Sequence, residues 1–550
     1  MFIYCSLFSG SIINLIKAEP WVSGRLNGLV NGLKGNIKNM ENNSRINNFL
    51  KNYGWLTLIL LLGAAFRLVF INWPHGLYVD QAQNAWDAIN ALTKGQWHWY
   101  YPGNGGREGL YIDLVAVSYW LFGVGVWQER LPGVLIGIST LIPFYLVAKQ
   151  FFDKKISLYI TLLLAINPWA VFMARSGLRA ILIPFLVCWC LYYLFRVIDN
   201  NKWRDWIFLS VFTGLLSHSY KAYPAMMVII LLVIFILLFK KKAWNKVLTS
   251  FGIILMISAP ALYERFLTGN MLSRELNVLN DAKENQVSII YVLFRYLDMF
   301  LLKGDTNRRD NFFAMPAIDF ISSLIILFAL GSLIYILIKH RNKFNWKMGI
   351  VALTFLGGMA VGIISMSEAP NYLRVSIALI PAILLVGWGI NLIKADPRLS
   401  GRFMVLLMGL SIGITIGIHT VVIYNAFNNP YEQKNINTAY CIDDYKQGIK
   451  YKNTNQKVAV LYPRGYDILV QVNTPEVLAL PFIIAAYPKQ VETKAFYPNM
   501  SYSYFNKNFK SGEIVYYPQI AIAQEYFGKN GYIFDKNKFK NLGNNYWMVK

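Results

Sequence analysis

The amino-acid sequence predicts an all-α polytopic membrane protein with about eleven transmembrane helices and a small C-terminal α/β domain. Composition is the first observation, because 15% of the 550 residues are charged and 55% are hydrophobic, against about 25% charged residues in soluble domains. The second is that the apolar residues fall in blocks of about twenty, the length that crosses a bilayer core. The third is that basic clusters separate these blocks in alternate loops.

The net charge of +24 is concentrated between the apolar blocks. The positive-inside rule places such loops, and the basic N-terminal stretch before the first block, in the cytoplasm. Anionic lipid head groups are a sufficient partner for this charge, so nucleic acid is not expected. The basic clusters lie at 154–155, 196–204, 240–242, 339–347 and 394–402, with Lys34, Lys38, Arg45 and Lys51 in the N-terminal stretch.

With the N-terminus inside, eleven spans place the C-terminus outside the membrane. Segment 110–126 is also apolar, but counting it as a span would reverse the sidedness of every later loop. We therefore predict an interfacial or re-entrant helix there. The predicted spans lie near 55–72, 131–151, 156–174, 179–197, 205–219, 223–240, 246–263, 319–338, 347–366, 372–393 and 402–424.

Three domains follow from this topology. Residues 1–50 are predicted to be a cytoplasmic N-terminal segment, because basic residues precede the first span. No signal peptide is predicted, because the apolar stretch 2–16 has no preceding basic region and no typical cleavage site. Residues 51–424 form the transmembrane domain, with outer loops at 73–130 and 264–318. Residues 425–550 are predicted to be an extracytoplasmic α/β domain, since β-like runs occur there at 458–462, 468–472 and 532–534. Met40 is a plausible alternative start.

Polar strings occupy the segments that this topology leaves outside. Ionisable groups within apolar helices cost about 2.5–3.5 kcal/mol each on insertion scales, so the gathering of such groups at span ends on one side favours a functional site. The alternative is that single side chains reach from the membrane to the interface. The polar strings are 78–87, 102–108, 174–179, 219–223, 304–310 and 368–374.

The four cysteines do not indicate a metal site. The spacing of Cys5, Cys188, Cys190 and Cys441 is not that of metal ligands.

The order of these strings resembles the GT-C glycosyltransferases over about residues 50–395. The resemblance is closest to the bacterial and archaeal relatives of protein O-mannosyltransferases and lipid A aminoarabinose transferases (family 39-like). The Trp-Trp-Asp-Tyr-Gly motif of oligosaccharyltransferases is absent. The motifs are an acidic loop after the first span, Gly106-Arg107-Glu108, Arg130-Leu131-Pro132, Arg175-Ser176-Gly177-Leu178-Arg179, Gly304-Asp305-x-Asn307-Arg308-Arg309-x-Asn311 and Ala369-Pro370-Asn371-x-Leu373-Arg374.

The resemblance implies inverting transfer of a sugar from a polyprenyl-phosphate carrier to a glycan, lipid or protein acceptor at the outer face of the cell membrane. Asp80 matches the family's catalytic aspartate, although the family commonly has Asp-Glu where this chain has Asp80-Gln81. The second carboxylate is therefore either dispensable or supplied by Asp87 or Glu108. Glu108 also matches a family position associated with acceptor or metal binding. The resemblance therefore leaves open whether a divalent metal takes part.

Each catalytic candidate has a structural alternative. Inversion needs one carboxylate to take the acceptor's proton, and a phosphate leaving group needs cations more than an acid. Asp80 could instead cap the helix that follows it. Asp87 could bond the loop backbone, and Arg107 with Glu108 could form an ion pair that holds the loop.

Predicted substrate ligands lie at the outer ends of the spans. Lys221 and Arg374 are the best phosphate ligands, because each sits at a membrane boundary where a lipid phosphate lies. Arg308 and Arg309 could close over the carrier or solvate a loop, and Tyr220 and Tyr223 could line the sugar site or join the interfacial aromatic belt. The remaining predicted ligands are Arg107, Arg175, Arg179, Asp305, Glu368 and Asn371.

Two other classes of protein compete with this interpretation. A transporter or flippase would place ionisable residues near the midplane, often with inverted repeats, whereas this sequence clusters them at one face and has no evident repeat. A non-catalytic receptor would not need the polar strings.

Overall fold

The computed structural model describes most of the chain between residues 44 and 463, and shorter pieces beyond. The chain forms two compact units, 1–61 and 62–550. Most of the predicted N-terminal segment, with the apolar stretch 2–16, lies outside the described residues. The described residues are 44–103, 106–267, 288–309, 311–365, 369–396, 401–453, 458–463, 480–489, 492–496, 511, 514–516, 539–543 and 546–549.

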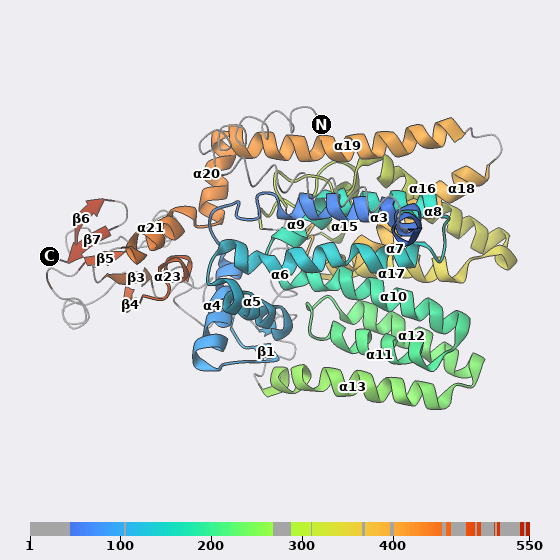
Figure 1. Ribbon diagram of the computed structural model, residues 1–550, viewed down its shortest axis with the longest axis horizontal. Helices are drawn as coiled ribbons and strands as arrows, with labels where there is room; N and C mark the ends of the chain where they lie inside the picture. Colours follow the sequence, from blue (N-terminus) through green and yellow to red (C-terminus); the bar gives the residue numbers. More distant parts are fainter. Residues whose placement is uncertain are drawn as a thin grey trace. The chain divides into compact units, whose positions relative to one another are not determined.

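The second unit consists mainly of α-helices that pack against one another, as α10 does with α11 and α16 with α18 (Figure 1). In chain order the helices are α3 Ser44–Leu68, α4 Val79–Lys94, α5 Gly109–Phe122, α6 Val126–Ser139, α7 Leu141–Ala148, α8 Lys154–Ile166, α9 Pro168–Arg175, η1 Arg179–Ile181, α10 Leu182–Asn200, α11 Trp203–Leu216, α12 Pro224–Lys241, α13 Trp244–Leu267, α15 Ile289–Leu301, α16 Phe320–Lys339, η2 Arg341–Lys343, α17 Trp346–Ser365, η3 Ser376–Ala378, α18 Leu379–Ala395 and α19 Gly401–Asn428.

Seven helical segments among the described residues are long and apolar enough to cross a membrane, and the bent pair α8–α9 would make an eighth. The prediction of a helical multi-pass membrane protein is therefore confirmed. The number eleven stays a prediction, because the apolar parts of α3 and α12 are shorter, at Tyr53–Leu68 and Pro224–Lys240, and α11 has 14 residues. The seven segments are Val126–Ala148, Arg179–Asn200, Trp244–Leu267, Phe320–Lys339, Trp346–Ser365, Ser376–Ala395 and Gly401–Asn428.

A bend of 49° separates α8 from α9. Pro168 begins α9 and has no N–H to continue the hydrogen bonding of α8. Asn167 caps the new helix, since its Oδ1 accepts from the Ala170 N–H at 2.9 Å, and its Nδ2 donates to the Ala317 carbonyl at 2.9 Å. The bend therefore directs α9 toward the turn that carries Arg175 and Arg179.

Helix α5 occupies the segment predicted to be interfacial. Its 14 residues extend about 21 Å at 1.5 Å per residue, less than the roughly 30 Å of a bilayer core. One side is buried at Tyr111 and Val115, while Trp120, Leu121 and Phe122 are each more than half exposed. An apolar helix of this length is a buried core helix, a re-entrant segment or an interfacial one, so the interfacial or re-entrant placement of α5 stays a prediction.

Ion pairs join the basic loops to one another. Lys347 Nζ lies 2.6 Å from Asp199, and Lys394 bonds Asp153, the residue that caps α8. Arg196 bonds Asp205 across the α10–α11 turn at 2.8 Å. Three of the clusters used for the topology prediction thus take part in contacts that are separate from those of the polar strings.

The C-terminal residues contain short helices and a five-stranded sheet of order β4-β3-β5-β7-β6. Strand β3 pairs in parallel with β4 and β5, and β7 runs antiparallel to β5 and β6. Strand β3 matches the predicted run 458–462, whereas 468–472 and 532–534 lie outside the described residues. The elements are α20 Pro430–Ala439, α21 Ile442–Lys452, β3 Ala459–Pro463, α23 Leu480–Ala486, β4 Glu492–Phe496, β5 Ile514–Tyr516, β6 Phe539–Gly543 and β7 Tyr546–Val549.

Candidate active site

The loop between α3 and α4 is held by Arg130, which is 1% exposed. Its guanidinium donates to the carbonyls of Ile71 at 3.1 Å, Pro74 at 3.0 Å and Gly76 at 2.9 Å. The planar fork of arginine suits several acceptors at once. The arginine of the Arg-Leu-Pro motif thereby fixes where α4 begins.

Asp80 lies in the first turn of α4 but does not cap it. The capping residue is Tyr78, whose N–H donates to Gln81 Oε1 at 3.0 Å, so the capping alternative for Asp80 is wrong. The Asp80 carboxylate instead pairs with Arg309 at 2.9 Å, and the Arg309 guanidinium carbon lies 5.8 Å from the centroid of the Tyr78 ring. The first turn of a helix also favours a negative charge.

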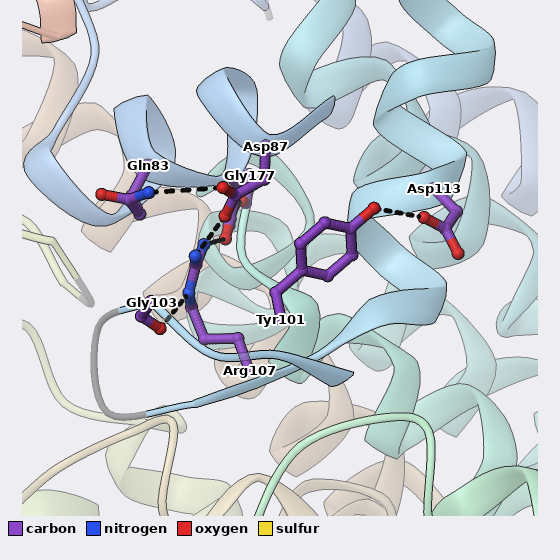
Figure 2. A network of polar contacts seen from close by, with 8 residues as sticks. Gln83, Asp87, Tyr101, Gly103, Arg107, Asp113 and Gly177 are labelled. Atoms are coloured by element: carbon purple, nitrogen blue, oxygen red, sulfur yellow. Dashed lines mark hydrogen bonds and ion pairs between the residues drawn. The ribbon is translucent and has the colours of Figure 1, made fainter. Parts of the chain in front are cut away.

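Asp87 lies two turns after Asp80 on the same face of α4. It is bound by Arg107 of the short strand β2, Arg107–Glu108 (Figure 2). Arg107 also donates to Asn84 Oδ1 at 2.9 Å and to the Gly103 carbonyl at 3.0 Å. Its side chain is 1% exposed. Burial lowers the pKa of Arg107, and the charge of Asp87 opposes that shift. This cluster ties α4 to the hairpin in which β1, Tyr100–Tyr101, pairs antiparallel with β2.

Glu108, the neighbour of Arg107, binds a different arginine. Its carboxylate accepts from Arg179 Nε at 2.6 Å, and both side chains are buried. The Arg179 guanidinium carbon lies 5.5 Å from the centroid of the Tyr220 ring. Successive residues of a strand point to opposite faces, so the alternative of an ion pair between Arg107 and Glu108 is wrong.

The Arg175–Arg179 turn contacts α4 through its backbone. Gln81 donates to the carbonyl of Ser176, and Asn84 Nδ2 donates to the carbonyl of Gly177 at 3.4 Å. Gly177 has a φ of +61°, and an added Cβ would come within 2.1 Å of Glu129 Oε2. Glycine suits this position for two reasons: it adopts a positive φ without strain, and it has no Cβ to clash with Glu129.

Asp305 was predicted to bind substrate, and the structure gives it a role in shaping its loop. The side chain is 2% exposed. Its Oδ1 accepts from the Asn307 N–H at 2.8 Å, and its Oδ2 accepts from the Tyr372 N–H at 2.9 Å. Asn311 Nδ2 donates to the Asp305 carbonyl at 3.1 Å. These bonds join the 304–311 loop to the segment that carries Arg374.

The predicted phosphate ligand Arg374 is half-buried and donates to Ser365 Oγ at 2.9 Å. Its backbone N–H donates to Asn371 Oδ1 at 3.0 Å, and the Asn371 N–H donates to the Tyr296 hydroxyl at 3.2 Å. Glu368 lies outside the described residues. Asn371 thus supports the turn that presents Arg374.

The structure also describes the predicted ligands Arg175, Arg308, Lys221 and Tyr223. Arg175 donates to the Phe70 carbonyl at 2.5 Å, and Arg308 pairs with Glu432 of α20 at 3.0 Å. Lys221 and Tyr223 are half-buried in the turn before α12, where the Tyr223 N–H donates to the Tyr220 carbonyl at 2.9 Å.

Asp113 is a polar residue that the sequence analysis did not select. It lies on α5, where its Oδ1 accepts from the Tyr101 hydroxyl at 2.9 Å (Figure 2). Burial raises the pKa of Asp113 to about 6, although the Tyr101 bond lowers it. A single acidic residue inside the apolar stretch 110–126 was the available signal. The sequence motifs include Gln81, Asn84 and Arg130, but the sequence did not predict which residues these side chains contact.

Metal binding stays a prediction. Among the described residues, no three His, Cys, Asp or Glu side chains are grouped as metal ligands. Asp87 and Glu108 are each paired with an arginine, and a metal would need those pairs to open.

Comparisons with known proteins agree with the resemblance drawn from the motifs. Residues 113–263 match the model of the family described as Dolichyl-phosphate-mannose-protein mannosyltransferase. "Putative mannosyltransferase YkcB" of Bacillus subtilis (strain 168) is 21% identical over 260 residues, which are 46% of this chain and 35% of that protein. "Putative mannosyltransferase YycA" of the same organism is 22% identical over 216 residues, 38% of this chain and 31% of that protein. The chain thus spans about a third of the length of these curated relatives.

The crystal structure of ArnT from Cupriavidus metallidurans bound to undecaprenyl phosphate aligns over 79% of this chain and 74% of that chain, with a TM-score of 0.47 and 14% identity. The family match and the two mannosyltransferase relatives confirm the predicted resemblance to the GT-C glycosyltransferases.

Proposed function

We propose that this protein is an inverting glycosyltransferase that moves a sugar from a polyprenyl-phosphate carrier to a glycan, lipid or protein acceptor at the outer face of the cell membrane. The supporting observation is the difference among three nearby carboxylates. Asp87 and Glu108 are 15% and 6% exposed and bind buried arginines, whereas Asp80 is 25% exposed and pairs with Arg309 of a loop. Asp80 is the carboxylate best placed to meet a substrate.

In this mechanism Asp80 takes the proton of the acceptor hydroxyl as that oxygen attacks the anomeric carbon. The bond to the carrier phosphate breaks on the opposite face, and its electron pair leaves with the phosphate, so the configuration inverts. Arg309 must release Asp80 for the carboxylate to act as a base. The released guanidinium is then available to the leaving phosphate, where positive charge stabilises the transition state.

Arg374 is proposed to hold the carrier phosphate before transfer. A phosphate at the membrane interface requires fixed cations to offset its desolvation. Arg374→Ala should raise the KM for the carrier at least about tenfold, the change expected from losing one charge-assisted hydrogen bond. Arg374→Lys should recover part of the loss, because a point charge replaces the bidentate fork. Unchanged carrier affinity in a binding assay with the purified Arg374→Ala protein would remove this residue from the donor site.

The function itself is tested in a deletion strain. If the protein consumes a polyprenyl-phosphate sugar, mass spectrometry of lipid extracts should find that donor accumulating, and one glycan, lipid or protein species should lack the sugar. Purified protein added to the extract should restore the product. An unchanged profile of lipid-linked sugars and products would argue against transfer, and a donor that accumulates only in the cytoplasmic leaflet would favour a flippase.

A further inference from the structure

We infer that Glu432 of α20 is a positioning residue for the Asp80 site: it holds Arg308 and thereby sets the position of Arg309 against Asp80. The inference rests on the proposed function, since it assigns a role in presenting Asp80 to substrate. Glu432 lies outside the segment matched by the family model and outside every polar string of the sequence analysis.

The contact between Glu432 and Arg308 is two-pronged. Arg308 Nε lies 3.2 Å from Glu432 Oε2, and Nη2 lies 3.0 Å from Oε2 and 3.3 Å from Oε1. The two side chains are 17% and 33% exposed. Such a fork fixes the orientation of the guanidinium as well as its distance.

Helix α20 is built to present this carboxylate. Asn429 caps it, because its Oδ1 accepts from the N–H groups of Tyr431 at 3.1 Å and Glu432 at 3.3 Å. Glu432 therefore stands in the first turn, where a negative charge is favourable. The neighbouring side chain of Lys434 is exposed.

Arg308 and Arg309 are consecutive residues with partners on different helices. Arg308 reaches Glu432 of α20, and Arg309 reaches Asp80 of α4 at 2.9 Å. The Tyr440 hydroxyl donates to the Arg308 carbonyl at 3.3 Å, so the same C-terminal segment also holds the peptide that joins the two arginines. A displacement of Arg308 is therefore passed directly to the partner of Asp80.

Glu432 also balances charge beside Asp80. Without it, Arg308 would lose the carboxylate that neutralises it, beside the arginine that pairs with Asp80, and an additional cation lowers the basicity of a nearby carboxylate. Both effects act on the transfer step, one through position and the other through charge.

The alternative is that the ion pair only attaches the C-terminal segment. That attachment has independent support, since the Tyr440 ring centroid lies 6.0 Å from those of Tyr78 and Phe312, and the Arg130 guanidinium carbon lies 5.8 Å from it. Because these contacts do not involve the Glu432 carboxylate, removing its charge should leave the segment in place.

The test compares Glu432→Gln with Lys434→Gln in the full-length protein. Each variant changes one charge on α20, but Lys434 is exposed and its side chain is not needed by the inference. Sugar transfer from a polyprenyl-phosphate sugar extracted from the deletion strain is measured in detergent. Glu432→Gln should lower kcat about tenfold, because small misplacements in an active site are costly, and should change the KM for the carrier less than about twofold. Lys434→Gln should match wild type.

The exchanged pair Arg308→Glu with Glu432→Arg supplies the decisive outcome. Recovery of most of the kcat lost in Glu432→Gln supports positioning through the pair, while a purely structural attachment would lower the thermal stability of Glu432→Gln and leave its kcat unchanged. If the wild-type protein is active and folded Glu432→Gln has the same kcat, the inference is overturned and the proposed function is not. A wild-type protein that transfers no sugar overturns the proposed function instead.

Discussion

Asp80→Asn should lower the rate of sugar transfer at least about a hundredfold, the size typical of a positioned acid–base group. Asparagine keeps the shape of the side chain but cannot accept a proton at neutral pH, whereas an ionised aspartate can. The substitution also loses the charge of the pair with Arg309, which is partly exposed. Because Gln81 rather than Asp80 makes the capping bond, α4 should stay folded.

The measurement is kcat of purified protein in detergent, with size-exclusion profile and thermal stability as checks of folding. Asp443→Asn is the matched control, since this carboxylate on α21 is exposed and bonds Asn437 at 2.8 Å; it should turn over like wild type. A folded Asp80→Asn protein with wild-type turnover would exclude Asp80 as the base. Asp87 and Glu108 would then be tested next.

Arg107→Ala should produce the largest loss of stability. It removes the partner of Asp87, whose side chain is 15% exposed, and the donors to Asn84 and Gly103. Removing one member of a buried ion pair costs about 3–5 kcal/mol, because the remaining charge is left without compensation. We expect a large drop in the midpoint of thermal unfolding in detergent, and little monodisperse protein on purification.

Two further variants separate the ion pair from general disruption. Arg107→Gln combined with Asp87→Asn removes both charges and keeps hydrogen-bonding groups, so it should recover much of the lost stability. Arg295→Ala breaks a partly exposed pair with Asp298 and should cost about 1 kcal/mol or less. An Arg107→Ala protein as stable as Arg295→Ala would contradict the structural role given to the pair.

The helices of the membrane domain were predictable because hydropathy reports directly on the solvent that surrounds each segment. Helix α5 was predicted to be distinct from a span through the charges of later loops rather than through its own residues, and this placement stays a prediction. The exact number of spans was not predictable, since α11 carries Arg204 and Asp205 at its start and has only 14 residues.

The polar strings of the candidate site were visible in the sequence, but most of their partners were not. The Arg107–Asp87 pair joins residues twenty positions apart, and Arg309–Asp80 joins residues 229 apart. Such pairs depend on how helices pack, and local spacing favours neighbours such as Arg107 and Glu108 instead. Glu432 gave no signal at all, because an acidic residue in a polar segment is ordinarily a solvated one.

Helix α5 begins immediately after Glu108 and exposes Trp120, Leu121 and Phe122 at its far end. Under the proposed function, contact of this apolar end with lipid would let a carrier that diffuses within one leaflet reach the site without crossing water. The encounter is then two-dimensional, and the relevant concentration is the mole fraction of carrier in the bilayer or micelle. Adding inert detergent at a fixed amount of carrier should therefore slow turnover by surface dilution. The KM for the carrier should then be expressed as moles of carrier per mole of amphiphile.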